Sequence, residues 1–458
     1  MTSLTELPEL TDDLIRRLDV PGPRYTSYPT APEWSPDLTG EQYLAKIGEA
    51  GRVAPDEPLS LYIHIPFCRE LCTYCGCNVV ISKDDSRADP YIEAVAKEME
   101  LVAAHLGPRR RLSQLHWGGG TPTFLNERQL GYLWSRIRSL FEPQPDAEVA
   151  IEVDPAITTR GQLDLLRSLG FNRLSMGVQD FDPDVQAAVN RIQSVEETRD
   201  LLVHARSLGF TGINFDLIYG LPRQTPASWQ RTLELVTELH PDRMAVYSFA
   251  FIPDLRHHQR KIDADEVPKG TDKLNLFRQT YKTFTEAGYR AIGMDHFAVP
   301  EDELSRAQRE RRLGRNFQGY TVKSAMDVVA FGVTGISDVQ GCYAQNVRPL
   351  KLYYDAIAAG QPATERGILL TEEDRVRRAL ITQLMCNFWL DLADFGGVGR
   401  FEPEMERLRH LESEGLVVLD GSQVDVTPLG RLFVRVVAMT FDTFLRRRTG
   451  TPGFSRTV

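Results

Sequence analysis

Residues 64–80 read HIPFCRELCTYCGCNVV and hold four of the six cysteines in this chain of 458 residues. From Cys68 through Cys72 and Cys75 to Cys77, the spacing is C-x-x-x-C-x-x-C-x-C. Three thiolates at the first two spacings can hold three irons of a [4Fe–4S] cluster, which leaves the fourth iron free to bind something else. Cys77 lies only two residues after Cys75, which is awkward for a fourth ligand. The motif therefore predicts a cluster with one open iron.

A zinc site or a redox dithiol stays the alternative for these cysteines, but the spacing favours it less. Structural zinc sites usually add a second ligand pair about 12–20 residues away. Cys342 and Cys386 lie much farther downstream and are expected in cores. A disulfide framework suits short secreted chains, whereas residues 1–14 are polar and acidic, unlike a signal peptide. We therefore expect reduced cysteines and a cytoplasmic protein.

The composition of the chain favours a globular protein and argues against nucleic-acid binding and a membrane span. Apolar residues make up 42% of the chain, which supports a full core. The formal net charge of −10 argues against nucleic acid as the main partner. The most apolar stretch, residues 431–445, is interrupted by Arg435 and Asp442, so no membrane span is expected.

After residue 36, predicted strands and helices alternate. The strands are 59–67, 112–120, 147–155, 172–179, 212–220 and 242–253. The helices between them are 90–106, 128–141, 161–170, 197–209 and 228–239, and a helix at 270–289 and a strand at 290–298 continue the pattern. Such alternation predicts an α/β fold with parallel strands joined by right-handed crossovers.

Glycines and polar residues gather at the same end of each predicted strand. The first strand runs into the cysteine loop and the second into GGGTPT at 118–123. Further along the chain, these ends carry Glu152 and Asp154, Gln179 and Asp180, and Asp216. In βα barrels the active site forms at the carboxyl ends of the strands, so we expect these groups at one rim. Taken singly, Glu152 could pair with an arginine and Asp216 could cap a helix.

The chain divides into three predicted parts. Residues 1–36 form an arm, 37–366 the catalytic domain, and 367–458 a smaller, mainly helical domain. In the last part, a helix at 370–392 and a hairpin around Asp420–Gly421 are typical of a winged-helix-like module. The acidic charge favours packing or substrate covering over DNA binding for this module.

Several segments together resemble those of a known family. They are PRYTSYPTA (23–31), the cysteine motif, HWGGGTPT (116–123), IEVDP (151–155), SMGVQDF (175–181), NFDLIYGLP (214–222), IGMDHFA (292–298), RNFQGYT (315–321), CYAQN (342–346) and GFSR (453–456). The chain resembles the radical S-adenosylmethionine enzymes and, more narrowly, the bacterial oxygen-independent coproporphyrinogen III oxidases. The likeness runs from about residue 21 to the end. It implies a partial (β/α)6 barrel of the kind found in radical S-adenosylmethionine enzymes, with an extended parallel sheet.

The resemblance implies a reaction and its cofactors. Members convert coproporphyrinogen III to protoporphyrinogen IX in haem biosynthesis, by oxidative decarboxylation of two propionates to vinyl groups. They use one [4Fe–4S] cluster and two S-adenosylmethionine molecules, and a 5′-deoxyadenosyl radical starts the reaction. A flavodoxin-like electron donor, an unidentified electron acceptor and a monomeric state are expected. A haem-binding chaperone and a radical methyltransferase that modifies haem are the alternatives, and Cys77, the arm and Arg191 favour the oxidase.

The resemblance also implies site residues. Cys68, Cys72 and Cys75 would ligate the cluster, whereas Cys77 would be needed without binding iron, and Cys77 and Tyr62 are the candidate catalytic residues. The first S-adenosylmethionine would contact Tyr62, Gly119, Glu152, Ala250 and Ile336. The second would contact Tyr74, Gly120, Thr121, Gln179, Arg191 and Asp216. The arm would fold over the active site.

The expected substrate carries four carboxylates, and the arginine fork matches carboxylate geometry. Arg24, Arg260 and Arg315 lie in family-like segments and are the candidate substrate contacts. The chain departs from the family at Phe251, where relatives commonly carry histidine. A contact through the main chain of Ala250 would survive this change, but a role for the missing imidazole would not. His257 and His258 are extra polar groups nearby, and adjacent histidines are more often solvated than catalytic.

Overall fold

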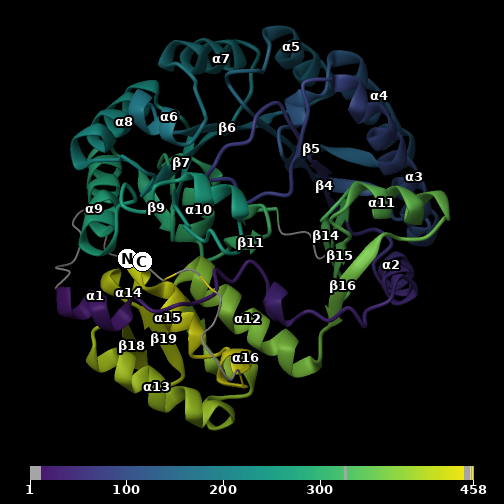
Figure 1. The fold of residues 1–458 in the computed structure, drawn as a ribbon. Coiled ribbons are helices and arrows are strands. Elements are labelled where there is room, and N and C mark those ends of the chain that lie inside the picture. Colours follow the sequence, from purple (N-terminus) through teal and green to yellow (C-terminus); the bar gives the residue numbers. More distant parts are fainter. Residues whose placement is uncertain (1–11, 324–326, 448–453, 455, 457–458) are drawn as a thin grey trace.

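The computed structural model describes residues 12–323, 327–447, 454 and 456. Within them, one twelve-stranded sheet has the order β16-β15-β14-β13-β1-β4-β5-β6-β7-β8-β10-β9 (Figure 1). Its six central strands are β1 (Leu59–Ile65), β4 (Arg111–Gly119), β5 (Glu142–Val153), β6 (Arg173–Gln179), β7 (Ile213–Tyr219) and β8 (Arg243–Ser248). They pair in parallel, each with the next. The predicted α/β fold with a mostly parallel sheet is confirmed.

Helices cover the outer face of this curved sheet (Figure 1). They are α2 (Gly40–Val53), α3 (Asp89–Leu106), α4 (Glu127–Leu140), α5 (Arg160–Leu169), α6 (Pro183–Ala188), α7 (Val195–Ser207), α8 (Pro226–Leu239) and α9 (Gly270–Glu286). Thr159 and Ser194 begin α5 and α7 with capping boxes, each accepting from the backbone N–H three residues on. Because strand side chains alternate, Leu115, Trp117 and Phe215 face the helices, while the opposite side of the sheet is left for polar residues.

The sheet is extended on both sides by strands that are mostly antiparallel. The predicted strand 290–298 is wrong in detail: it is two strands, β9 (Arg290–Gly293) and β10 (His296–Ala298), and β10 runs antiparallel to β8. The chain reverses between them at Met294, which has φ +47°. The alternation of strands and helices in the sequence does not predict this reversal.

At the other edge of the sheet, next to β1, lie short strands that were not predicted from the sequence. β13 (Val328–Phe331) is parallel to β1, and β14 (Ile336–Val339), β15 (Cys342–Asn346) and β16 (Thr364–Leu369) continue antiparallel. Helix α11 (Leu350–Ala358) connects β15 to β16. The predicted parallel extension is therefore parallel only at β13.

The C-terminal part packs beside the sheet as helices and a small three-stranded sheet (Figure 1). Helix α12 (Glu372–Asn387) ends earlier than predicted because Phe388 adopts φ +56°, after which β17 (Trp389–Asp391) begins. β17 pairs with β19 (Gln423–Val426), which forms the predicted hairpin with β18 (Val417–Asp420). The remaining helices are α13 (Glu402–Ser413), α14 (Pro428–Leu432), α15 (Val434–Met439) and α16 (Thr443–Arg447).

The N-terminal segment is fastened to this C-terminal part. It begins with α1 (Asp12–Leu18), and the hydroxyl of Tyr25 donates to Asp442 at 2.9 Å. Arg435 donates to the carbonyl oxygen of Pro23 at 3.0 Å. Leu14, Leu18, Tyr25 and Tyr28 are buried in one apolar cluster with C-terminal residues. The arm therefore has a defined course between the sheet and the C-terminal helices.

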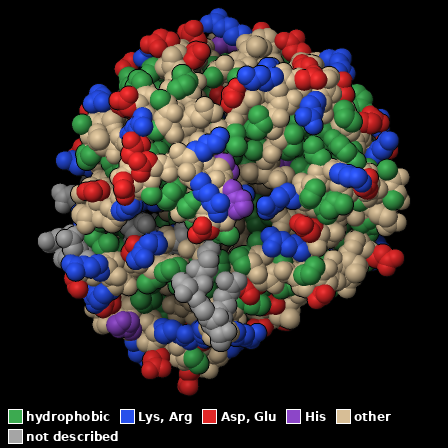
Figure 2. All heavy atoms as spheres, viewed as in Figure 1, with side chains coloured by type: hydrophobic (Ala, Val, Ile, Leu, Met, Phe, Trp, Pro, Cys, Tyr) green, Lys and Arg blue, Asp and Glu red, His purple; other side chains and the backbone are tan. Residues whose placement is uncertain are grey.

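Two surface properties bear on partners. No helix among the described residues is long and apolar enough to span a membrane. Acidic and basic side chains are interspersed over the face seen in Figure 2. That face does not present the single-sign basic surface typical of nucleic-acid binding.

Candidate active site

The cysteine loop sits at the carboxyl end of β1, between the short strands β2 (Phe67–Cys68) and β3 (Val80–Ile81). Cys68, Cys72 and Cys75 are half-buried, Cys77 is exposed, and all four are free thiols. The loop is held by the backbone N–H of Cys75, which donates to the Cys72 carbonyl at 3.1 Å. The structure thus brings the three predicted ligands together on one ordered turn at the barrel rim.

Polar groups lie beside the sulfurs. Arg191 Nη1 donates to Cys72 Sγ at 3.9 Å, and Thr121 Oγ1 lies 3.5 Å from Cys68 Sγ. Burial raises the pKa of the Cys68 thiol to about 12. Iron binds the thiolate form of cysteine, so it would have to displace the proton of Cys68. At Cys72, the positive charge of Arg191 favours the thiolate.

The fourth thiol behaves differently from the ligand candidates. A hydrogen bond from the Cys77 thiol lowers the pKa of Cys75, and the same bond raises the pKa of Cys77. Among the described residues, no three metal-binding side chains converge on a single ion. Cysteines that each bind a different iron need not converge, so the donor set fits a cluster held by Cys68, Cys72 and Cys75.

Glycines at the end of β4 let Glu152 and His64 approach the backbone. A Cβ on Gly118 would lie 2.6 Å from Glu152 Oε1, and one on Gly119, at φ +118°, would lie 2.6 Å from the His64 ring. The Gly119 N–H donates to Glu152 Oε2 at 2.9 Å, and His116 Nε2 lies 3.1 Å from Oε1. Burial acts to raise the pKa of Glu152, but these partners outweigh it and hold the pKa below its usual value. Glu152 is therefore a carboxylate.

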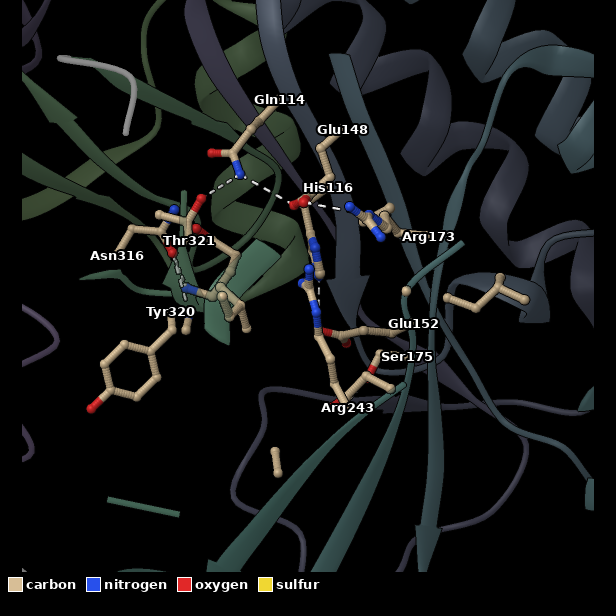
Figure 3. A pocket seen from close by; sticks show the side chains of 18 of the residues that line it. Gln114, His116, Glu148, Glu152, Arg173, Ser175, Arg243, Asn316, Tyr320 and Thr321 are labelled. Carbon is tan, nitrogen blue, oxygen red and sulfur yellow. Dashed lines mark hydrogen bonds and ion pairs between the residues drawn. The ribbon is translucent and has the colours of Figure 1, made fainter. Parts of the chain in front are cut away.

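A cavity of about 140 Å³ lies inside the curved sheet (Figure 3). Side chains from successive strands point into it, among them His116 and Glu152 (Figure 3). Barrel interiors are ordinarily filled by branched apolar side chains, so a polar interior is suited to a ligand. Tyr62, in the middle of β1, stacks on His116 with ring centroids 5.8 Å apart and so lies beside this cavity.

Asp216 also lines this cavity, on β7. It accepts from Ser175 Oγ at 2.7 Å and from Asn214 Nδ2 at 2.9 Å. Burial raises the pKa of Asp216 to about 6. Both of these partners are neutral, so the carboxyl group is suited to meet a polar or cationic group of a ligand.

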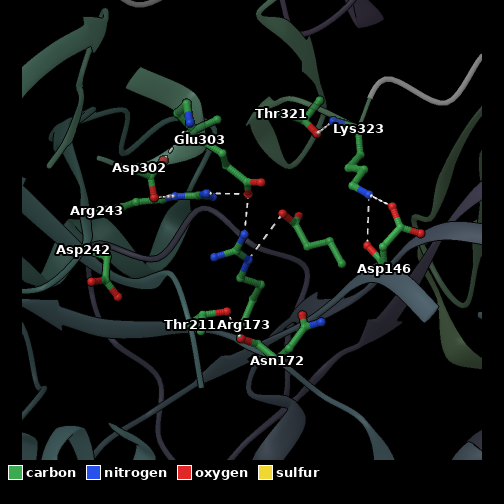
Figure 4. A network of polar contacts seen from close by, with 12 residues as sticks. Asp146, Asn172, Arg173, Thr211, Asp242, Arg243, Asp302, Glu303, Thr321 and Lys323 are labelled. Carbon is green, nitrogen blue, oxygen red and sulfur yellow. Dashed lines mark hydrogen bonds and ion pairs between the residues drawn. The ribbon is translucent and has the colours of Figure 1, made fainter. Parts of the chain in front are cut away.

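The opposite, amino end of the barrel is closed by an ion network (Figure 4). Arg243 Nε pairs with Asp302 at 2.9 Å and Arg243 Nη2 with Glu303 at 2.8 Å, at the start of α10 (Glu303–Arg309). Arg173 also pairs with Glu303, and Glu148 lies 3.6 Å from Arg173 Nε. Charged groups therefore fill the amino end of the barrel, and ligands would reach the interior cavity from the carboxyl ends of the strands.

Known proteins share both the barrel and the C-terminal part of this chain. The model of the radical SAM superfamily matches residues 62–236, and that of the HemN C-terminal domain matches residues 370–433. Oxygen-independent coproporphyrinogen III oxidase of Escherichia coli K12 is 46% identical over 451 residues, covering 97% of this chain and 98% of the relative. The enzyme of that name from Synechocystis is 40% identical, covering 100% of both chains. This chain belongs to the family of oxygen-independent coproporphyrinogen III oxidases.

A solved family structure has the same fold. The structure reported as "Coproporphyrinogen III oxidase (HemN) from Escherichia coli is a Radical SAM enzyme" superposes with a TM-score of 0.90 at 44% identity, covering 96% of this chain and 100% of that one. Family membership therefore rests on both sequence and fold.

Several of the residues expected from the family to contact S-adenosylmethionine lie at or beside the cysteine loop, among them Tyr74, Thr121 and Arg191. Arg191 pairs with Asp154 at 3.1 Å and donates to the Gly177 carbonyl at 2.6 Å, which holds it beside Cys72. Gln179 stands at a bulge of β6 with φ +65°. Tyr74 packs with Phe251 against a small apolar cluster, Ala250 is exposed after β8, and Ile336 begins β14.

The three candidate substrate arginines do not lie together. Arg24, on the arm, pairs with Asp295, and Arg315 Nη1 donates to the Arg24 carbonyl at 2.8 Å. Arg315 lies on β11 (Gly314–Asn316), which pairs with β12 (Gly319–Thr321). Arg260 is an exposed side chain 4.0 Å from Asp254. Of the three, only Arg24 and Arg315 form one cationic group.

Sequence reasoning missed several polar residues of the interior. Ser175 and Asn214 are inward-facing partners of Asp216, and Tyr247 and His296 line the same cavity. Since inward residues recur every second position, Asn214 could have been found from Asp216. His258, expected to be solvated, lies with Nε2 2.8 Å from the Cys75 carbonyl oxygen. No local signal identifies this contact.

Proposed function

We propose that this protein carries out the oxygen-independent oxidative decarboxylation of two propionates of coproporphyrinogen III to vinyl groups, giving protoporphyrinogen IX. The observation that carries the proposal is identity of 46% to a curated oxidase over nearly the whole of both chains. The complete cysteine motif, with Cys77, supports it against a haem-binding chaperone. Relatives named for the oxidation, rather than for methylation, support it against a haem-modifying methyltransferase.

The chain's own groups would have three tasks. Cys68, Cys72 and Cys75 would hold the cluster, which together with S-adenosylmethionine supplies a carbon radical able to remove hydrogen from a propionate. Glu152, with its pKa held low, would accept hydrogen bonds from the cofactor. The ion network at the amino end would keep water from entering behind the reacting atoms. The pyrrole ring stabilises the substrate radical, so no strong acid or base is required, and orientation matters most.

We also propose two S-adenosylmethionine molecules, held by the two residue sets given above. The first set centres on Glu152 and Gly119, and the second on Asp216, Gln179 and Arg191. Two carboxylates on different strands, each with its own partners, support two sites. Titration of the anaerobic holoenzyme with the cofactor should reach two molecules per cluster, and saturation at one would contradict this part of the proposal.

Several expectations stay predictions. They are a flavodoxin-like electron donor, an unidentified acceptor, a monomer, a cytoplasmic location, and a division into residues 1–36, 37–366 and 367–458. The apolar cluster of the C-terminal part supports a boundary near residue 367, although the cluster also takes in four arm residues and residues from β9 to β12.

The test of the function is anaerobic reconstitution with iron and sulfide, followed by incubation with coproporphyrinogen III, S-adenosylmethionine and a chemical reductant. The expected products are protoporphyrinogen IX, carbon dioxide and 5′-deoxyadenosine. Absence of turnover with retained tetrapyrrole binding would favour the chaperone. A methylated or linear tetrapyrrole would favour the methyltransferase.

A further inference from the structure

A second, larger cavity of about 730 Å³ opens at the carboxyl ends of β7 and β8. Tyr219 ends β7 and Ser248 ends β8, and the segment from Phe249 to Ile252 forms one wall. Helix α9 forms the opposite wall with Lys273 and Leu274. The volume lies within the range of roughly 300–1,000 Å³ found for small-molecule sites. The cavity is distinct from the interior one, because it lies beyond the strand ends.

Lys273 is the unusual residue of this cavity. Its Nζ donates to the Phe249 carbonyl at 2.6 Å and lies 5.9 Å from the centroid of the Tyr219 ring. Among the described residues, Lys273 forms no ion pair, although Asp19 lines the same cavity and its negative charge acts on the lysine from farther away. Burial lowers the pKa of Lys273 to about 8. An ammonium group withdrawn from water without a paired anion is costly, and a bound anion would relieve that cost.

Aromatic and apolar side chains make up much of the remaining lining, although α1 and the segment after it add the charged residues Arg16 and Asp19. Tyr219, Phe249 and Phe251 line one side, and Val267 and Leu274 lie on the others. Phe249 and Phe251 contact each other with ring centroids 6.1 Å apart. A large apolar ring system that carries carboxylates would bury its rings on such walls and place an acid group on Lys273.

Further cations lie next to this cavity. A smaller neighbouring cavity shares Tyr219, Ser248 and Arg456 with it and is lined by Arg24, by the Asp295 that pairs with Arg24, and by Arg435. Arg24 and Arg435 come from the arm and from α15, so the arm closes one side of the cationic region. A ligand with several carboxylates could therefore reach more than one positive group.

We propose that the tetrapyrrole substrate binds in this cavity between β7, β8 and α9, and that Lys273 pairs with one of its propionate carboxylates. The assignment rests on the proposed function and goes beyond it by placing the substrate. Ala250, an expected contact of the first cofactor molecule, lines the same cavity. The rings would thus lie next to the place where the radical forms, as orientation requires.

The test compares Lys273→Met, Lys273→Arg and a matched control, Lys282→Met, in the reconstituted holoenzyme. Lys282 lies on the same helix, but it is exposed, lies 3.9 Å from Glu286 and does not line the cavity. Binding of coproporphyrin III, the stable oxidised form of the substrate, is followed by quenching of its fluorescence. Lys273→Met should raise the dissociation constant and the KM by about tenfold or more, with kcat changed little. Lys273→Arg should restore much of the affinity, and the control should stay within about twofold.

A second variant keeps the test decisive if Lys273→Met does not fold. Thr271 is an exposed residue in the first turn of α9 and lines the cavity, so Thr271→Asp adds an anion where helices accept one. It should weaken coproporphyrin binding, whereas Thr271→Asn should not. With an active parent enzyme, unchanged binding in Lys273→Met, or in Thr271→Asp where Lys273→Met does not fold, would overturn the assignment alone. A parent enzyme that neither binds nor converts the tetrapyrrole would overturn the proposed function itself.

Discussion

His258 Nε2 lies 2.8 Å from the main-chain carbonyl oxygen of Cys75, across 183 residues of sequence. Next to it, Gln259 Nε2 lies 3.5 Å from the Tyr74 carbonyl oxygen and donates to the Ala250 carbonyl at 3.1 Å, so the segment after β8 is tied to the cysteine loop. Position 251 is phenylalanine in this chain, and His258 supplies an imidazole at the cysteine loop. We therefore expect His258 to position the loop.

His258→Ala should loosen the turn that carries Cys75. A hydrogen bond of this kind contributes about 1 kcal/mol, so the protein should fold but lose iron several-fold faster. The measurement is decay of the iron–sulfur absorbance near 400 nm in the presence of a chelator under nitrogen. His257→Ala is the matched control, because His257 is exposed on the same turn. Equal decay rates for both variants would show that the contact does not hold the loop.

Substitution of Cys72 should remove the cluster, whereas substitution of Cys77 should impair catalysis and leave the cluster in place. Replacing Cys72 by Ala should abolish the low-temperature paramagnetic signal of the reduced cluster, because one of three anchors is lost. Cys77→Ala should keep the signal but reduce turnover by at least about a hundredfold, consistent with a group that meets reacting atoms. Cys342→Ala, in the core, is the control for loss of a thiol as such. Loss of the signal in Cys77→Ala would make Cys77 a ligand instead.

Arg315 and Arg260 should behave differently. Arg315 lies against Arg24 in the cationic group, whereas the side chain of Arg260 is 60% exposed. Arg315→Met should raise the KM for coproporphyrinogen about tenfold, and Arg260→Met should change it less than twofold. Steady-state kinetics under anaerobic conditions measures both. The reverse order would place the substrate at the outer rim, near Asp254.

Glu98 should make stability depend on pH. It is 3% exposed, accepts from Tyr353 and Asn346 at 2.6 Å, and has a pKa raised by burial to about 7. Between pH 4.5 and 7 the folded state holds this proton while the unfolded state has released it. The unfolded state then binds fewer protons, so stability falls as pH rises through this window.

Glu98→Gln keeps a neutral side chain of similar size and removes the titration. Between pH 5 and 8, the change in the free energy of unfolding should be smaller in Glu98→Gln than in the parent protein, by about 1–3 kcal/mol. Denaturant unfolding of the metal-free protein at the two pH values measures this. Glu100→Gln, on the exposed side of the same helix, should leave the dependence unchanged. A steeper pH dependence in Glu98→Gln than in the parent would contradict the assignment.

The alternation of strands and helices was predictable because each element carries its own period and its own cap. The capping residues Thr159 and Ser194, for example, mark helix starts within four residues of sequence. The short strands β13 to β16 were not predictable, since they owe their pairing to partners rather than to length or pattern. The same holds for the reversal at Met294, which depends on a single backbone angle.

The amino-acid sequence by itself determined the cysteine spacing, and with it the chemistry, because ligands a few residues apart stay close in any compact loop. It also determined the order of the barrel strands and the glycines that end β4. Only the tertiary structure decided which charges meet. Arg24, Arg315 and Arg435 come from the arm, from β11 and from α15, and Lys273 faces Phe249 from a helix. Contacts between such distant residues follow from burial of the apolar faces that carry them, which no local pattern encodes.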